Sequence, residues 1–210
     1  MAQITKISAQ VRRKDLVNIF LDGKYSFSVS LEDVFVKNLK VGQTLEESDI
    51  QKLKKAKKDK NIFDLVIRYT SLRPHSEKEI KNYLKTKDQT DAQITNILKR
   101  LKKLSLINDL DFAKWFTTSR QNSNKGSQLI KYQLLQKGVG KDIITKALLS
   151  AQLSDKKLAA NALDKKLNTS NLSTKDIDFK AKQKLLRYLI TKGFDYETSR
   201  SAIDLRLKKV

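Results

Sequence analysis

The 210-residue chain contains no cysteine, one histidine and one proline. Without cysteine it has no disulfide, no thiol nucleophile and no thiolate metal ligand, which suits a reducing cytoplasm. The single histidine, His75, excludes a metal site built from several imidazoles. No apolar run approaches the roughly 20 residues of a membrane-spanning helix, and residues 1–10 lack the apolar stretch of a signal peptide. We therefore expect a cytoplasmic protein with no cofactor and no membrane partner.

Negative charge is also scarce: the chain has 44 Lys and Arg but only 23 Asp and Glu, which gives a formal net charge of +21. The excess is not confined to a tail: residues 1–110 carry 23 basic and 14 acidic side chains, and residues 111–210 carry 21 and 9. The balance disfavours a small-molecule enzyme built on acidic residues. An anionic partner is the first functional class to consider.

Residues 1–30 show the alternation of apolar and polar residues that is typical of strands. Asp22 and Gly23 separate two such runs, and this dipeptide favours a two-residue type I′ hairpin, in which both residues have positive φ. We predict a small antiparallel sheet of about three strands. Ser30 then begins a short helix over residues 31–39.

From residue 48 onwards the apolar residues recur with the 3.6-residue period of helices. Residues 83–88, 133–138 and 188–193 align with one another at offsets of 50 and 55 residues. A unit of this size in three helices has a thin core, so neighbouring units must stack. We predict a mainly α fold of three tandem three-helix repeats in an elongated curved array, behind the small β domain. The predicted domains are residues 1–47 (β-containing domain), 48–61 (basic linker helix), 62–107, 108–152 and 153–210 (repeats).

Three short motifs have a catalytic interpretation and a simpler structural one. Residues 138–141 (GVGK) resemble the end of a phosphate-binding loop but lack its first glycine and its Ser or Thr, so we interpret Gly138 as a helix C-cap. Residues 154–157 (SDKK) match S-x-x-K without its companion motifs, and a helix N-cap is favoured. Asp109 and Asp111 follow Asn108, which indicates an N-cap with acidic residues in the first turn.

Some residues are predicted to be structural or simply solvated. Aromatic residues on apolar stripes are expected to pack in the core and not to stack on bases; they are Tyr83, Phe112, Trp115, Phe116 and Tyr188. His75 lies in a connection after Pro74 and is expected to be exposed. A loop over residues 169–174 would absorb the five extra residues of the third repeat.

Residues 73–80 (RPHSEKEI), followed by residues 106–113 (LINDLDFA), resemble RecX, the bacterial regulator of the RecA recombinase. Gly126, Ile130, Leu134 and residues 138–139 fit the second repeat of that family, and residues 192–194 fit its third. The resemblance covers about residues 60–208, and the N-terminal part is similar to an extension of some longer members. His75 departs from the pattern, where the family more often has Arg, as does Asp88, where glycine closes the other two equivalent helices.

The resemblance implies a non-enzymatic modulator that lies in the groove of a RecA filament on single-stranded DNA and hinders filament growth, ATP hydrolysis and strand exchange. Candidate contact residues lie on the polar sides of the helices or beside their caps, where the three units could align them in one stripe. They are Arg68, Arg73, Lys78, Lys81, Lys85, Lys125, Lys131, Lys137, Lys182, Arg187 and Lys192. No heptad seam is evident, so we expect a monomer.

Two other functions remain open at this point. Three-helix units resemble helix-turn-helix modules, so the chain could be a direct DNA-binding or architectural protein whose partner is bare DNA. Affinity for bare DNA discriminates this hypothesis from the first. A metal-dependent nuclease using Asp109 and Asp111 is the third, and it requires cleavage when magnesium or manganese is added.

Overall fold

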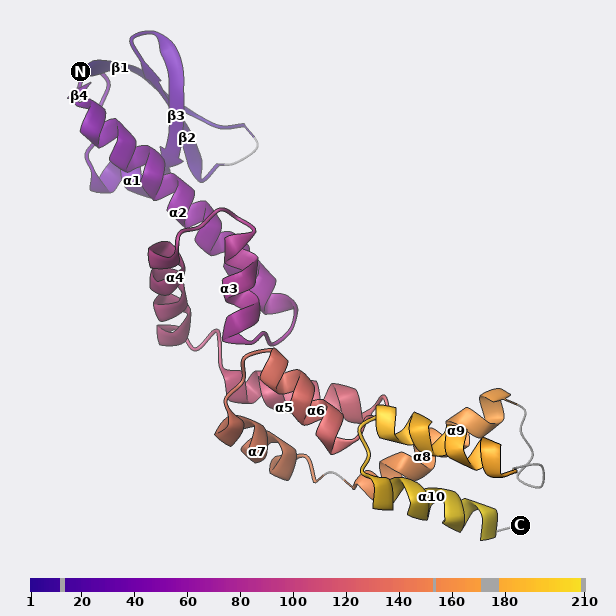
Figure 1. The fold of residues 1–210 in the computed structure, drawn as a ribbon. Coiled ribbons are helices and arrows are strands. Elements are labelled where there is room, and N and C mark those ends of the chain that lie inside the picture. The colour runs from indigo at the N-terminus through magenta and orange to yellow at the C-terminus, as the bar shows by residue number, and fades with distance from the viewer. Residues whose placement is uncertain (12–13, 153, 171–177, 209–210) are drawn as a thin grey trace. The chain divides into compact units, whose positions relative to one another are not determined.

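The computed structural model describes residues 1–11, 14–152, 154–170 and 178–208. Within these residues the chain forms two compact units, Met1–Tyr69 and Thr70–Val210. The first contains an antiparallel sheet and the second contains helices (Figure 1). The boundary falls within one long helix, α2 (Glu47–Leu72).

The sheet of the first unit has four strands in the order β3-β2-β1-β4. They are β1 (Ala2–Ala9), β2 (Leu16–Leu21), β3 (Lys24–Ser30) and β4 (Thr44–Leu45). Asp22 and Gly23 have φ values of 49° and 82°, as the predicted type I′ turn requires. The prediction of about three strands missed β4, because two residues that pair with Ala2 and Gln3 are too short to show alternation.

One face of the sheet packs into a core with the start of α2. Ile4, Ile19 and Val29 are almost fully buried there, together with Ile50 and Leu53 of α2. Before α2 comes a short helix, α1 (Leu31–Val36), in which the Ser30 hydroxyl accepts a hydrogen bond from the Asp33 amide at 3.1 Å. The helix is shorter than predicted, because Asn38 adopts a left-handed backbone conformation with φ of 49°.

Helix α2 is one continuous helix of 26 residues. It contains both the predicted linker, residues 48–61, and the start of the first predicted repeat, so no break in the helix marks position 61. The predicted domain boundaries are therefore not visible as helix ends at this point, and they stay predictions.

The second unit continues with eight helices in the described residues. They are α3 (Glu77–Lys85), α4 (Asp91–Lys103), α5 (Asp109–Gln121), α6 (Ser127–Gln136), α7 (Lys141–Ser150), α8 (Asp155–Ser170), α9 (Phe179–Thr191) and α10 (Tyr196–Lys208). Helices α5–α7 share one apolar core, centred on Phe112, Ile130 and Leu134. Helices α8–α10 lie side by side in Figure 1 and share a second core around Leu163 and Leu189.

The predicted repeat register is visible in the backbone and in the core. Asp88, Gly138 and Gly193 follow equivalent helices and have φ values of 55°, 81° and 93°. Equivalent apolar residues are buried in all three repeats: Ile80, Ile130 and Leu185 are one such set, and Leu84, Leu134 and Leu189 are another. The mainly α fold with three-helix repeats and a small N-terminal antiparallel sheet is thus confirmed, while the elongated curved array stays a prediction.

Three local predictions need correction. His75, in the connection between α2 and α3, is buried with 5% of its surface exposed, and its Nδ1 contacts the Arg73 carbonyl oxygen instead of solvent. Phe112 and Phe116 are in the core, but Trp115 is 37% exposed because it lies at the edge of that helix face. Thr169 and Ser170 are the last residues of α8 and do not form a loop, whereas residues 171–174 lie outside the described residues.

Candidate functional site

The helical repeats of the second unit meet end to end at two joints of similar design. At the first joint the N-terminus of α3 meets the C-terminus of α6. The Ser76 hydroxyl donates a hydrogen bond to the Lys137 carbonyl oxygen at 2.8 Å, and Lys78 Nζ donates one to the Gln136 carbonyl oxygen at 2.9 Å. The free carbonyls at the end of α6 are thus satisfied by side chains from the preceding repeat.

At the second joint the N-terminus of α6 meets the C-terminus of α9 in the same way. The Gly126 amide donates to the Lys192 carbonyl oxygen at 2.9 Å, and the Gln128 amide donates to the Gly193 carbonyl oxygen at 3.3 Å. Both glycines are required by this approach. A Cβ on Gly126 would lie 2.3 Å from the Gly193 carbonyl oxygen, and a Cβ on Gly193 would lie 2.3 Å from Leu129 Cβ.

An aspartate from the first helix of the following repeat completes each joint. The Glu77 amide at the start of α3 donates to Asp109 Oδ1 at 2.9 Å, and the Ser127 hydroxyl at the start of α6 donates to Asp155 Oδ2 at 2.6 Å. A carboxylate is stabilised at a helix N-terminus, where amides are free and the helix dipole is positive. Asp109 therefore holds a structural contact, and the described residues contain no group of three or more His, Asp or Glu that could hold a metal ion.

The helix caps predicted from the sequence account for the other motifs. Asn108 accepts a hydrogen bond from the Leu110 amide at 2.9 Å, and Ser154 accepts one from the Lys157 amide at 3.4 Å. Gly138 follows α6 with φ of 81°, and Gly140 is the N-cap residue of α7. The Asn108 N-cap and the Gly138 C-cap are confirmed as the structural interpretations of these motifs.

At the first joint the Glu79 carboxylate lies between two cations. This carboxylate accepts hydrogen bonds from Arg73 Nη1 at 2.9 Å and from Lys137 Nζ. Burial raises the pKa of Glu79, but the hydrogen bonds and charges of Arg73 and Lys137 outweigh burial and hold its pKa below the ordinary value. The Arg73 guanidinium also lies over the Trp115 ring, 5.1 Å from its centroid. Two of the predicted contact residues, Arg73 and Lys137, are thus engaged within the protein.

His75 adds a pH-sensitive group to the first joint. Its Nδ1 lies 2.7 Å from the Arg73 carbonyl oxygen, which can only accept, so the neutral ring carries its proton on Nδ1. Burial lowers the pKa of His75 from its ordinary value of 6.5, and the charge of Arg73 lowers it further. The folded protein therefore favours the neutral ring.

We expect the folded protein to lose stability as the pH falls below 6.5. Between that value and the lowered pKa of His75, the unfolded chain binds the proton more readily, so protonation favours unfolding. Urea unfolding at about pH 7.5 and about pH 5.5 measures the change. His75→Asn, which keeps a donor near Nδ1 but does not titrate, should remove most of it. An equal pH dependence in both proteins would show that His75 is not responsible.

The second joint gathers three cations, and none of them forms an ion pair with a carboxylate of the described residues. Lys125 and Lys192 lie close together beside Arg120, and burial and then the interaction with Lys192 lower the pKa of Lys125. Lys125 lies directly before Gly126, and Lys192 directly before Gly193, so the glycine contact that forms the joint also brings the two lysines together.

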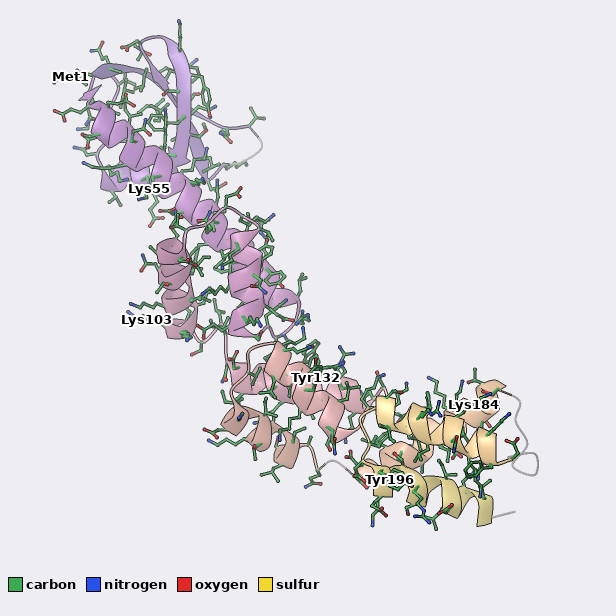
Figure 2. The ribbon with its side chains drawn as sticks, viewed as in Figure 1. Met1, Lys55, Lys103, Tyr132, Lys184 and Tyr196 are labelled. Atoms are coloured by element: carbon green, nitrogen blue, oxygen red, sulfur yellow. The ribbon has the colours of Figure 1, made fainter. Side chains whose placement is uncertain are left out.

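The remaining predicted contact residues are distributed over the helices. Arg68 is exposed on α2, in the first unit. In the second unit five others are exposed: Lys81, Lys85, Lys131, Lys182 and Arg187. Charged side chains, such as the labelled Lys103 and Lys184, surround the helices (Figure 2). The sequence did not single out Arg120, Lys165 and Lys166 as site residues, because only the tertiary fold places them near Lys192. The repeat register, which aligns the joints, is the signal that could have indicated this region.

These features define a helical-repeat protein with linked three-helix modules and a large excess of positive charge. Family models describe three parts of the chain: the N-terminal domain of the regulatory protein RecX matches residues 2–46, and the second and third three-helix domains of RecX match residues 108–148 and 155–203. No helix in the described ranges is long and apolar enough to cross a membrane.

Relatives support the same family over nearly the full chain. The regulatory protein RecX of Clostridium beijerinckii is 36% identical, over 97% of this chain and 95% of its own. The regulatory protein RecX of Bacillus licheniformis is 38% identical, over 97% of this chain and 77% of its own. A crystal structure of regulatory protein RecX is similar with a TM-score of 0.71 at 30% identity, covering 97% of this chain and all of that one. The chain belongs to the RecX family of regulatory proteins, which confirms the resemblance.

Proposed function

We propose that this chain is a non-enzymatic regulator of the RecA recombinase. It binds RecA filaments on single-stranded DNA and limits filament growth, ATP hydrolysis and strand exchange. The observation that carries this proposal is membership of the RecX family over nearly the full chain. We further propose that it acts in the cytoplasm as a monomer, without a cofactor.

The charge distribution supports contact with a filament that contains DNA. DNA in a filament remains a polyanion, and a chain with a net charge of +21 gains affinity by releasing the counterions condensed on it. The two joints couple consecutive repeats through direct hydrogen bonds, so cations of different repeats are held in one register. Such an array suits a partner that is itself a repeating polymer.

Within the predicted contact set we propose a division of labour. Arg73, Lys78 and Lys137 bond to groups of the first joint and act mainly as structural residues. The other eight contact the filament and its DNA, and they are Arg68, Lys81, Lys85, Lys125, Lys131, Lys182, Arg187 and Lys192.

The activity test is ATP hydrolysis by RecA on single-stranded DNA, with the purified protein added. We expect the rate of ATP hydrolysis and the yield of strand exchange to fall as the protein concentration rises. A combined Lys81→Glu and Lys85→Glu variant, which reverses two exposed charges of α3 without touching a joint, should inhibit less. No effect of the parent protein at any ratio to RecA would refute the proposal.

Direct DNA binding is the competing function, and its signature is different. A protein that makes about six phosphate contacts on bare duplex DNA should lose on the order of a thousandfold in affinity between about 50 and 200 mM salt. Tight, sequence-selective duplex binding in the absence of RecA would favour this second function over the first.

A further inference from the structure

A basic surface pocket lies beside the second joint. Its volume is about 200 Å³, and the turn between α5 and α6 encloses it together with α8 and α9. The lining side chains that carry charge or hydrogen-bonding groups, apart from the Tyr188 hydroxyl, are Ser123, Asn124, Lys165, Lys166, Thr169 and Lys192. None of the described residues that line the pocket is acidic. The pocket thus offers ammonium groups and neutral polar groups, a combination suited to an anion.

Positive charge is concentrated at this pocket. The Lys166 and Lys192 ammonium groups both lie over the Tyr188 ring, 5.7 and 5.2 Å from its centroid. Lys125 lies next to Lys192, and its lowered pKa reflects burial and the neighbouring charges. The Arg120 Nε is buried and has no hydrogen-bond partner among the described residues. Cations held this close repel one another, and a bound anion relieves that repulsion.

Carboxylates on the neighbouring elements are engaged elsewhere. Asp155 at the start of α8 accepts hydrogen bonds from Ser127, and Asp164 farther along α8 pairs with Arg206 at 2.9 Å. Asp195, before α10, accepts hydrogen bonds from Thr198. These three carboxylates are thus held at other partners. Asp178, before α9, accepts a hydrogen bond from the Ala181 amide at 2.7 Å and lines a neighbouring pocket together with Lys166.

The first joint has a similar arrangement of helices, but there a carboxylate pairs with the cations. Lys137 at the first joint is equivalent to Lys192 at the second. Each is the residue that follows the helix, and its carbonyl oxygen accepts a hydrogen bond across the joint. The third residue of α3 is Glu79, which pairs with Lys137. The third residue of α6 is Leu129, an apolar residue. Lys192 therefore corresponds to Lys137, Leu129 takes the place of the Glu79 carboxylate, and Lys125 is a further cation at the position of His75.

We propose that this pocket binds one phosphate group of a single-stranded DNA backbone, held by Lys166 and Lys192, with Lys125 beside Lys192 adding positive charge. The inference rests on the proposed function, which supplies the strand. Pockets for drug-sized ligands measure about 300–1,000 Å³, so this smaller pocket admits a phosphate and leaves the sugar and base outside. That arrangement suits a strand that runs across the surface and is bound without regard to its sequence.

The experiment places a carboxylate where the first joint has one. Leu129→Glu adds the missing counter-ion, and Leu129→Gln is the matched control with nearly the same shape and no charge. The affinity of the full-length protein for a fluorescent oligothymidylate is measured by anisotropy over a range of chloride concentrations. Leu129→Glu should weaken binding by on the order of tenfold and lower the slope of log K against log salt by about 0.7. Leu129→Gln should bind like the parent.

A second variant keeps the test decisive if Leu129→Glu fails to fold, as judged by circular dichroism. Lys125→Ala combined with Lys192→Ala retains the backbone bonds of the joint and should show the same loss of affinity and slope. The proposal is overturned if this variant keeps the parent affinity and slope, if the Glu and Gln variants weaken binding equally, or if the parent does not bind the oligonucleotide.

Inorganic phosphate distinguishes a strand from a free anion as the occupant. At constant ionic strength it should compete with the oligonucleotide in the parent and not in Leu129→Glu. Phosphate binding that leaves oligonucleotide affinity unchanged would overturn the assignment to DNA. The experiment also separates this proposal from the proposed function. If the parent binds the oligonucleotide through the pocket but does not sediment with RecA filaments, the filament is refuted as the partner and the phosphate pocket is not.

Discussion

Gly193→Ala is expected to destabilise the helical unit by about 3 kcal/mol, the sum of two separate costs. Gly193 has φ of 93°, which a side chain disfavours, and its new Cβ would lie 2.5 Å from the backbone nitrogen of Leu129. The N-terminus of α6 would have to withdraw from α9. Thermal unfolding followed by circular dichroism should show a fall in Tm of roughly 10 °C, and amide hydrogen exchange at Gly126 and Gln128 should accelerate.

Alanine substitutions at two other glycines separate the cost of the steric clash from the cost of the positive φ. Gly126→Ala introduces only the steric clash, because its φ is −77°, and should cost about 2 kcal/mol. Gly140→Ala introduces neither, because φ is −66° and no atom beyond the chain neighbours lies within 4 Å of the new Cβ, so only the loss of a glycine N-cap remains, at about 1 kcal/mol or less. Equal Tm values for the Gly193 and Gly140 variants would contradict the packing of the second joint.

Glu79→Ala is expected to have the second-largest effect, about 2 kcal/mol. Its carboxylate is 15% exposed and holds Arg73 and Lys137 together, so its removal leaves two cations without their shared partner. The value lies below the range for a fully buried pair, because both cations are about one-third exposed and water screens them. Urea unfolding at neutral pH measures the change.

The neighbouring Glu77 provides the matched control. It lies on the same helix and pairs with Lys102 at 2.6 Å, but its side chain is 40% exposed. Glu77→Ala should therefore cost less than about 1 kcal/mol, although it too removes an ion pair. The parent should also lose stability as the pH falls below 4.5 toward the lowered pKa of Glu79, and Glu79→Ala should reduce this dependence. Equal effects of the two substitutions would contradict the role given to Glu79.

The sequence predicted the repeat architecture because that architecture depends on periodic signals. Residues such as Ile80, Ile130 and Leu185 recur at matching places, and burial follows from that recurrence. The type I′ turn at Asp22 and Gly23 was predictable for the same local reason. Strand β4 was not, because two residues stabilised by pairing with β1 leave no pattern in the sequence.

The roles of individual cations depend on tertiary neighbours and could not be predicted locally. Arg73 and Lys125 look alike as basic residues in connections, yet Arg73 meets a carboxylate and Lys125 meets another lysine. At equivalent helix positions the first joint has Glu79 and the second has Leu129, and the effect of that difference depends on tertiary contacts across the joints. The exposure expected for His75 was wrong for a similar reason, since its burial depends on the connection it occupies.

The most direct test of the proposed function is co-sedimentation with RecA filaments assembled on single-stranded DNA, compared with the same DNA alone at equal ionic strength. We predict that the protein pellets with the filaments at salt concentrations where it no longer pellets with naked DNA. Equal recovery with naked DNA, or no recovery with filaments, would contradict the assignment of RecA filaments as the partner.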